Sequence, residues 1–223
     1  MSFYTLAQIK ALVKDPLDLN EEVFVDDTEI TSYINDGIRE AEANINTIYE
    51  DYFLTKAAIP LVAGTSVYSL PADIYANKVR GFIYDDGADS YQVAKLRDFK
   101  EIPFLEQSWS YQFLLTNSLS SGVQVNIYPT PRITSGTALT CWYLRNARQL
   151  SADSDVCDIP EFVNFIVQHG KVRAMEKEGH PLLDTARSDW ERQRTLMVET
   201  LSAMIVDEDN KITLDTSMYE EMS

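Results

Sequence analysis

Apolar and small residues recur every three or four positions near the start of the chain, and this spacing predicts amphipathic helices there. The longer segment starts at Asp26 or Asp27, where Asp26 and Glu29 have the spacing of a capping box. It runs to about Phe53 and is preceded by a shorter helix from Thr5 to Lys14. The chain therefore opens with two helices.

The helical period returns after Arg148. Asp158 is the expected cap of a segment that has Pro160 near its first turn and ends at Gly179. Pro181 then opens a second long segment with apolar residues near heptad spacing. We expect two antiparallel helices joined by the short turn between Gly179 and Pro181.

The middle of the chain alternates apolar and polar residues and is punctuated by turn signals such as Ala63-Gly64 and Ser135-Gly136. Both features predict antiparallel β structure. The expected strands are Lys56–Leu61, Ser66–Leu70, Lys78–Tyr84, Ser90–Lys95, Tyr111–Asn117, Val123–Tyr128 and Thr137–Leu144.

These patterns predict an α+β fold in which helices from both ends of the chain form a bundle around an inserted β module. Residues 1–54 and 149–206 form the helical part, and residues 55–148 form an antiparallel β-sandwich or small barrel. Residues 207–223 are acidic and poor in apolar side chains, so we expect an extended tail that orders only against a partner.

Charge restricts the possible partners. The 223 residues include 35 Asp and Glu against 19 Lys and Arg, a formal net charge of −16. A nucleic-acid groove and an anionic membrane surface both need the opposite balance. No stretch approaches the roughly 20 apolar residues that span a bilayer, and we expect no export signal and no membrane contact.

Few residues suit nucleophilic or redox chemistry. His169 falls on an apolar helical face and is expected to be a partly buried structural histidine, while His180 lies in a turn. Neither follows the pattern of a catalytic nucleophile and its base. Cys141 and Cys157 have no disulfide or metal-ligand spacing.

Carboxylates gather in three places, at residues 85–89, 153–158 and 207–211, but none has the full spacing of a calcium loop. They are expected to be solvated turns and caps. No glycine-rich phosphate loop is present, so the sequence predicts no metal, no cofactor and no catalytic residues. Sequence spacing alone leaves open a paired-carboxylate site.

The chain has 24 aromatic residues, which favours binding through protein interfaces. We expect about two thirds of these aromatic residues to belong to the core. The others are expected on exposed strand faces and loops, for example Tyr75, Tyr84, Tyr91, Trp109 and Tyr111.

Several motifs, taken in their order, resemble the head-to-tail adaptor (connector) proteins of tailed bacteriophages. They cover about residues 28 to 180 and include a Tyr-x-Leu-Pro-x-Asp segment between two strands. The matching segments are Ile34-Asn-Asp-Gly-Ile-Arg-Glu40, Tyr68-Ser-Leu-Pro-Ala-Asp73, Val79-Arg-Gly-Phe-Ile-Tyr84, Val123-Gln-Val-Asn-Ile-Tyr-Pro129, and Leu150-Ser-Ala-Asp-Ser-Asp155 with Asp158-Ile-Pro160.

The resemblance implies a structural, non-enzymatic protein of the virion neck, assembled in the host bacterial cytoplasm. It implies a ring of twelve copies that docks on the portal protein and joins the tail tube, a nozzle protein or a tail fibre. The genome would pass through this ring, and an acidic channel would repel DNA phosphates instead of binding them.

Amphipathicity and acidity suggest where such a ring makes its contacts. Tyr33, Ile38, Ile45 and Tyr49 on the long N-terminal helix are the expected ring contacts. The tail, represented by Asp207, Glu208, Asp209 and Tyr219, is the expected contact with the portal or the phage tail. The alternatives are a soluble carboxylate-dependent hydrolase and a generic β-sandwich binding module with helical flanks.

Overall fold

The computed structural model describes residues 3–15, 25–85, 90–105, 110–118, 122–132 and 138–209. The chain divides into two compact units, which we call the helical unit (Met1–Tyr52 with Ala147–Ser223) and the β unit (Phe53–Asn146). Helices and strands thus separate into different parts of the chain, and the predicted α+β class is confirmed.

Two helices open the helical unit, and both begin with a capping box. In α1 (Leu6–Lys14), the Thr5 hydroxyl and the Gln8 side chain each bond the other residue's backbone N–H. In α2 (Asp27–Ile48), Asp26 and Glu29 do the same, as predicted. The helix ends earlier than expected, because a separate 3-10 turn, η2 (Glu50–Phe53), follows it.

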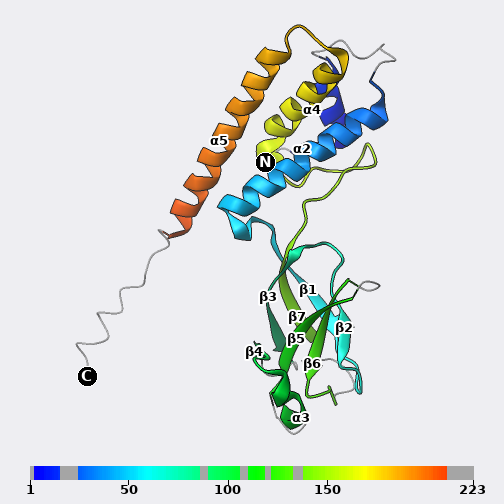
Figure 1. Ribbon diagram of the computed structural model, residues 1–223, viewed down its shortest axis with the longest axis vertical. Helices are drawn as coiled ribbons and strands as arrows, with labels where there is room; N and C mark the ends of the chain where they lie inside the picture. The colour runs from blue at the N-terminus through cyan, green and yellow to red at the C-terminus, as the bar shows by residue number, and fades with distance from the viewer. Residues whose placement is uncertain are drawn as a thin grey trace, which may run out of the picture. The chain divides into compact units, whose positions relative to one another are not determined.

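The C-terminal half of the helical unit contains α4 (Val163–Glu178) and α5 (Leu183–Asp209). Gly179 closes α4 in the left-handed conformation with φ +67°, where a residue without a Cβ is favoured. Helices α4 and α5 run antiparallel across this turn, as predicted (Figure 1). Helix α5 continues to Asp209 and so includes the first three residues of the predicted tail, whose remaining residues lie outside the described part of the chain.

The predicted cap at Asp158 is also wrong. The helical segment starts as a 3-10 turn, η4 (Pro160–Phe162), whose cap residue Ile159 makes no side-chain hydrogen bond. The Asp158 carboxylate instead accepts the Arg148 N–H at 3.1 Å. The Asp158 carboxylate, which the sequence predicted to cap the helix, is therefore bonded to the Arg148 backbone instead.

Helix α4 packs against α1, α2 and α5 (Figure 1). Each of these helices contributes buried apolar side chains. The apolar stripe of α2 is covered within the chain itself. Buried residues of this unit include Leu6, Ile9, Val13, Ile30, Ile34, Ile38, Ile45, Phe165, Ile166, Met197 and Leu201.

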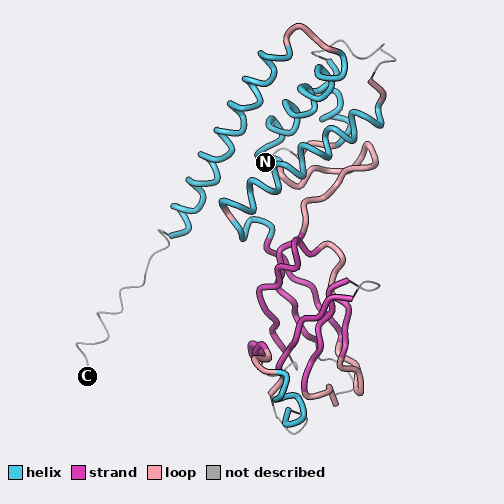
Figure 2. Tube along the Cα trace, in the orientation of Figure 1, coloured by secondary structure: helices cyan, strands magenta, loops and turns pink. Residues whose placement is uncertain are grey.

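The β unit is one seven-stranded sheet with the order β1-β7-β3-β4-β5-β6-β2 (Figure 2). All seven strands lie where the alternating pattern predicted them, within a few residues at each end. The strands are β1 (Leu54–Pro60), β2 (Val67–Ser69), β3 (Ile74–Asp85), β4 (Ser90–Lys95), β5 (Gln112–Ser118), β6 (Gly122–Tyr128) and β7 (Ala138–Arg145).

The sheet differs from the expected antiparallel sandwich or closed barrel. It is a single curled sheet, a half-barrel, and every strand contributes to one core on its inner face. Five of its six pairings are antiparallel, but β4 and β5 run parallel, with Ala94 opposite Gln112 and Lys95 opposite Phe113. The connection between them, residues 96–111, carries the 3-10 turn η3 (Phe99–Glu101) and the one-turn helix α3 (Ile102–Leu105).

Candidate functional site

His169, the first residue considered for catalysis, is a buried structural residue on α4. Only 5% of it is exposed, and its Nδ1 lies 3.1 Å from the carbonyl oxygen of Tyr33 on α2. Burial lowers the pKa of the imidazole, while the Glu40 carboxylate, 3.5 Å from Nε2, acts in the opposite direction. The prediction of a partly buried helix histidine is confirmed.

The remaining candidates for reactive groups also have structural roles. His180 lies in the α4–α5 turn, as expected, where its Nδ1 accepts the Leu182 N–H at 3.1 Å. Cys141 and Cys157 are buried free thiols, and burial raises their pKa to about 12 and about 11. Neither thiol forms the reactive thiolate near neutral pH.

Of the carboxylate groups considered as calcium loops, residues 153–158 are explained by a turn, while Asp207 and Asp209 lie in α5 and residues 86–89 lie outside the described part of the chain. Asp155 accepts the N–H groups of Ala152 and Ser151, each at 2.8 Å, and these bonds lower the pKa of its carboxyl to about 2. Arg148 adds an ion pair at 2.8 Å. Among the described residues, no three His, Cys, Asp or Glu side chains are placed to hold a metal ion.

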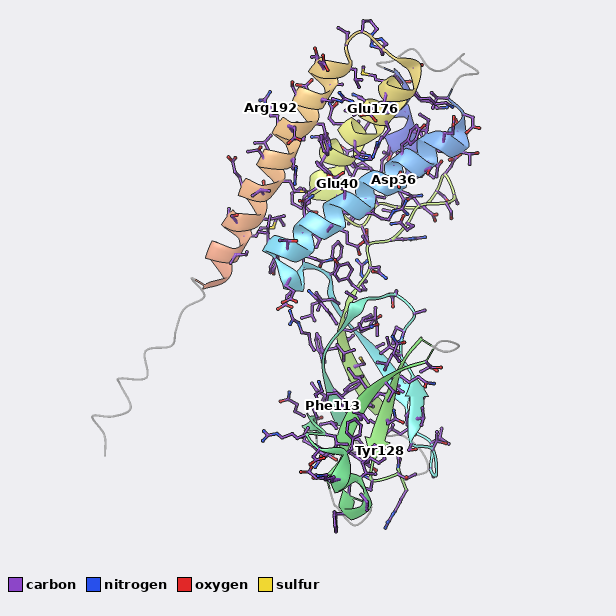
Figure 3. All side chains as sticks on the ribbon, viewed as in Figure 1. Asp36, Glu40, Phe113, Tyr128, Glu176 and Arg192 are labelled. Carbon is purple, nitrogen blue, oxygen red and sulfur yellow. The ribbon has the colours of Figure 1, made fainter. Side chains whose placement is uncertain are left out.

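A charged hollow of about 230 Å³ lies where α2, α4 and α5 meet. Glu176 on α4 is its centre, because it pairs with Arg173 at 3.2 Å and with Arg187 at 2.9 Å (Figure 3). Arg187 and Arg173 lower the pKa of the Glu176 carboxyl. The acid is thus compensated, as in a structural ion-pair network.

The prediction of exposed aromatic residues is partly wrong. Tyr84 is buried, and its ring packs 5.1 Å from Tyr91 and 4.9 Å from Tyr111, between centroids. Tyr75, Tyr91 and Tyr111 are half-buried, and Trp109 lies outside the described residues. The most exposed aromatic side chains described are Phe99 at 69% and Phe104 at 79%, both on the η3–α3 segment.

The Tyr-x-Leu-Pro-x-Asp motif has a structural role within the β unit. Tyr68 is buried, and its hydroxyl accepts the Val62 N–H and donates to the Thr65 carbonyl, at 3.0 and 2.7 Å. Asp73 accepts the Tyr143 hydroxyl at 3.1 Å. The Tyr68 bonds fix the turn between β1 and β2, and the Asp73 bond ties the segment between β2 and β3 to β7.

A model of the SU10 adaptor protein family, a family of phage head-to-tail adaptors, matches residues 4–214. The chain belongs to this family. The resemblance inferred from the sequence motifs is therefore confirmed. No curated protein matches the sequence. Members of the SU10 adaptor family are structural proteins of the virion neck.

In this adaptor, the two units carry very different charge. The β unit has eight Lys and Arg against seven Asp and Glu, whereas the helical unit has 11 against 28. Among the described residues, no helix is long and apolar enough to span a membrane. The acidity of the adaptor therefore belongs to its helical unit.

The expected ring contacts on α2 of the adaptor fall into two groups. Ile38 and Ile45 have no exposed surface, because the apolar stripe of α2 packs inside the helical unit. Tyr33 and Tyr49 are half-buried. Asp207, Glu208 and Asp209 form the end of α5, and Tyr219 lies outside the described residues.

A polar stripe on α2 was not anticipated from the sequence. Asn35, Arg39 and Glu42 lie on one side of the helix and bond Leu150, Gln149 and Ala147 in the segment that leaves the β unit. Glu42 is buried and accepts the Ala147 N–H at 2.7 Å, and Arg39 donates to the Gln149 side chain at 3.1 Å. Their spacing of three or four residues is the only sequence signal for this stripe.

Proposed function

We propose that the chain assembles into a ring, of twelve copies, that docks on the portal protein, joins the head to the tail and surrounds the DNA path. The observation that carries this proposal is the family match over residues 4–214. The ring would meet a tail tube or nozzle protein, or a tail fibre, on its other side. It would assemble in the host bacterial cytoplasm and act without catalysis.

The charge distribution supports a channel that does not hold DNA. With 28 acidic residues against 11 basic ones, the helical unit repels a phosphate backbone wherever its surface faces the genome. A DNA-binding groove would require the reverse. We therefore propose that helical surfaces, arranged as a bundle around the axis, line the channel.

Burial refines the proposed contacts. Tyr33 and Tyr49 retain exposed surface and stay assigned to the contact between neighbouring subunits. Ile38 and Ile45 support this contact indirectly, by fixing α2 against the rest of the helical unit. Asp207, Glu208, Asp209 and Tyr219 stay assigned to contacts with the portal or the tail.

The first experiment mixes the purified full-length chain with the portal of its own phage. Negative-stain imaging and light scattering should show rings bound to the portal. Because an adaptor can stay monomeric until it meets the portal, the chain alone is a control and not the test. A chain that never associates with the portal under any ratio contradicts the proposal.

A second experiment tests the channel. Acidic residues within 1–60 are changed to the corresponding amides, with Asp26, Glu29 and Glu42 left unchanged because they cap α2 or are buried. Rings should still form, while genome delivery slows. A control variant neutralises acids of the β unit instead, and infectivity unchanged by the first set would refute the channel role.

A further inference from the structure

Two cavities adjoin on the β unit and form one groove. Each has a volume of about 400 Å³, and both are lined by Arg80, Gly81 and Gln92. The first cavity extends over Ile83 and Trp142. The second extends over Lys95 on β4 and Phe113 on β5, and Phe113 is labelled in Figure 3. We call this feature the β3–β4 groove.

The groove lies where two strands separate. The β3–β4 ladder pairs Asp85 with Ser90 and continues to Phe82 with Val93. The next residues of β4, Ala94 and Lys95, pair with β5 instead, while β3 stays paired with β7. The strands therefore diverge beside Gly81, and this divergence leaves an opening between them.

Gly81 makes the groove hollow. A Cβ at this position would meet only the Gln92 side-chain nitrogen, at 3.8 Å, and the backbone does not require a glycine there. Gly81 therefore leaves space for the groove and is not needed for an unusual backbone conformation. A large side chain at position 81 would fill the groove without straining the sheet.

The chain itself contains a segment that matches the groove. Residues 210–223 follow the end of α5, and fourteen residues in extended form reach about 45 Å. Ile212 and Leu214 are two residues apart, so in extended form they lie on one side, about 7 Å from each other. That spacing suits two adjoining cavities, each of which has apolar residues in its lining.

Charge complementarity favours the same occupant. Residues 210–223 contain three acidic residues and one lysine. The groove has the cations Arg80 and Lys95 on its lining, and the described residues that line it include no Asp or Glu. An acidic segment with alternating apolar residues should therefore bind this groove more tightly than a neutral segment would.

We propose that Ile212–Leu214 of one copy binds the β3–β4 groove of a second copy and links neighbouring subunits. The inference rests on the proposed ring, and it leaves Asp207–Asp209 and Tyr219 available to other partners. A contact between two different surfaces of one chain repeats around a closed ring.

Two full-length variants test the exchange in trans. In one, Ile212→Asp with Leu214→Asp disables the segment and leaves the groove intact. In the other, Gly81→Leu fills the groove and leaves the segment intact. Each variant alone should stay monomeric on size exclusion without the portal, and the mixture should form a heterodimer. No association in the mixture overturns the proposal.

A labelled peptide of residues 210–223 provides a direct measurement. Fluorescence anisotropy should show that it binds the variant carrying Ile212→Asp and Leu214→Asp. Arg80→Glu with Lys95→Glu should weaken this binding by about tenfold. The control pair Arg97→Glu with Lys100→Glu, which does not line the groove, should leave it unchanged, and circular dichroism should show that all variants are folded.

The two hypotheses fail in different ways. Peptide that binds the portal but not the β unit overturns this inference and leaves the proposed ring intact. Peptide bound in the groove, with no ring on the portal, refutes the proposed function and leaves the exchange intact. Binding that is equally strong to the Arg80→Glu, Lys95→Glu and Gly81→Leu variants places the segment elsewhere and also overturns the inference.

Discussion

Asn35 and Leu150 are joined by two hydrogen bonds. The Asn35 amide nitrogen donates to the Leu150 carbonyl, and the Leu150 N–H donates to the Asn35 amide oxygen, both at 2.9 Å. A side chain on α2 thus pairs with the backbone as a neighbouring strand would. It fixes the segment that returns from the β unit to the helical unit.

Replacing Asn35 with Ala should lower the free energy of unfolding by about 2 kcal/mol, because both Leu150 groups lose their partner. Urea unfolding followed by circular dichroism measures the change. Arg39→Ala on the same stripe is the control and should cost about 0.5 kcal/mol or less, since its partner is exposed. Equal costs for the two variants would contradict this account.

Gly37 lies where α2 crosses α4, and a larger residue should not fit there. A Cβ at this position would come within 3.2 Å of the His169 Cβ. Gly37→Leu should therefore destabilise the chain by about 2–3 kcal/mol, because the helices must separate. Thermal unfolding tests this, with Gly81→Leu in the open groove as the matched control that should leave the midpoint unchanged.

His169 predicts a dependence of stability on pH. Burial lowers its pKa in the folded chain, so the unfolded chain binds the proton more tightly. The stability that comes from keeping this imidazole neutral is fully present above the ordinary histidine pKa of about 6.5. It is lost as the pH falls below that value. Glu40 and Asp36 from α2 and Arg173 from α4 also face or act on this imidazole.

The test compares denaturant midpoints of the parent chain and His169→Gln between pH 7.5 and pH 5. The parent should lose more stability on acidification than the variant, which cannot gain a proton at this position. If both lose the same amount, the imidazole is not the group responsible, and other acidic or basic residues control the change.

Replacing Asn46 with an apolar residue should stabilise the folded chain. Its side chain is buried on α2, and neither its amide nitrogen nor its oxygen has a hydrogen-bond partner in the described part of the chain. Asn46→Leu should raise the free energy of unfolding by about 1–2 kcal/mol, because a leucine of similar size needs no partner. A lower midpoint in chemical denaturation would show that the amide is satisfied after all.

The periodicity of the chain predicted its elements better than their pairing. Alternation placed seven strands correctly because each pattern is local and one face of the sheet is buried. The parallel pairing of Lys95 with Phe113 was not predictable, because it depends on how residues 96–111 return the chain. Turn signals favour hairpins and do not reveal such a crossover.

The candidate contacts show a related limit. The stripe containing Ile38 and Ile45 identified a face that must be covered, but amphipathicity does not say whether the same chain or a neighbour covers it. Glu42 lies off that stripe, so the sequence pattern predicts that it is exposed to solvent. In the structure it is buried and accepts the Ala147 N–H. Only the fold shows that a backbone N–H reaches it.

The two ends of the β unit are hydrogen-bonded neighbours. Leu54 at the start of β1 lies opposite Leu144 near the end of β7, so the unit begins and ends at one point. A module attached in this way can be lost, gained or exchanged between phages without rerouting a single helix. Evolution can therefore adapt the β unit to new partners while the helical unit keeps its own packing.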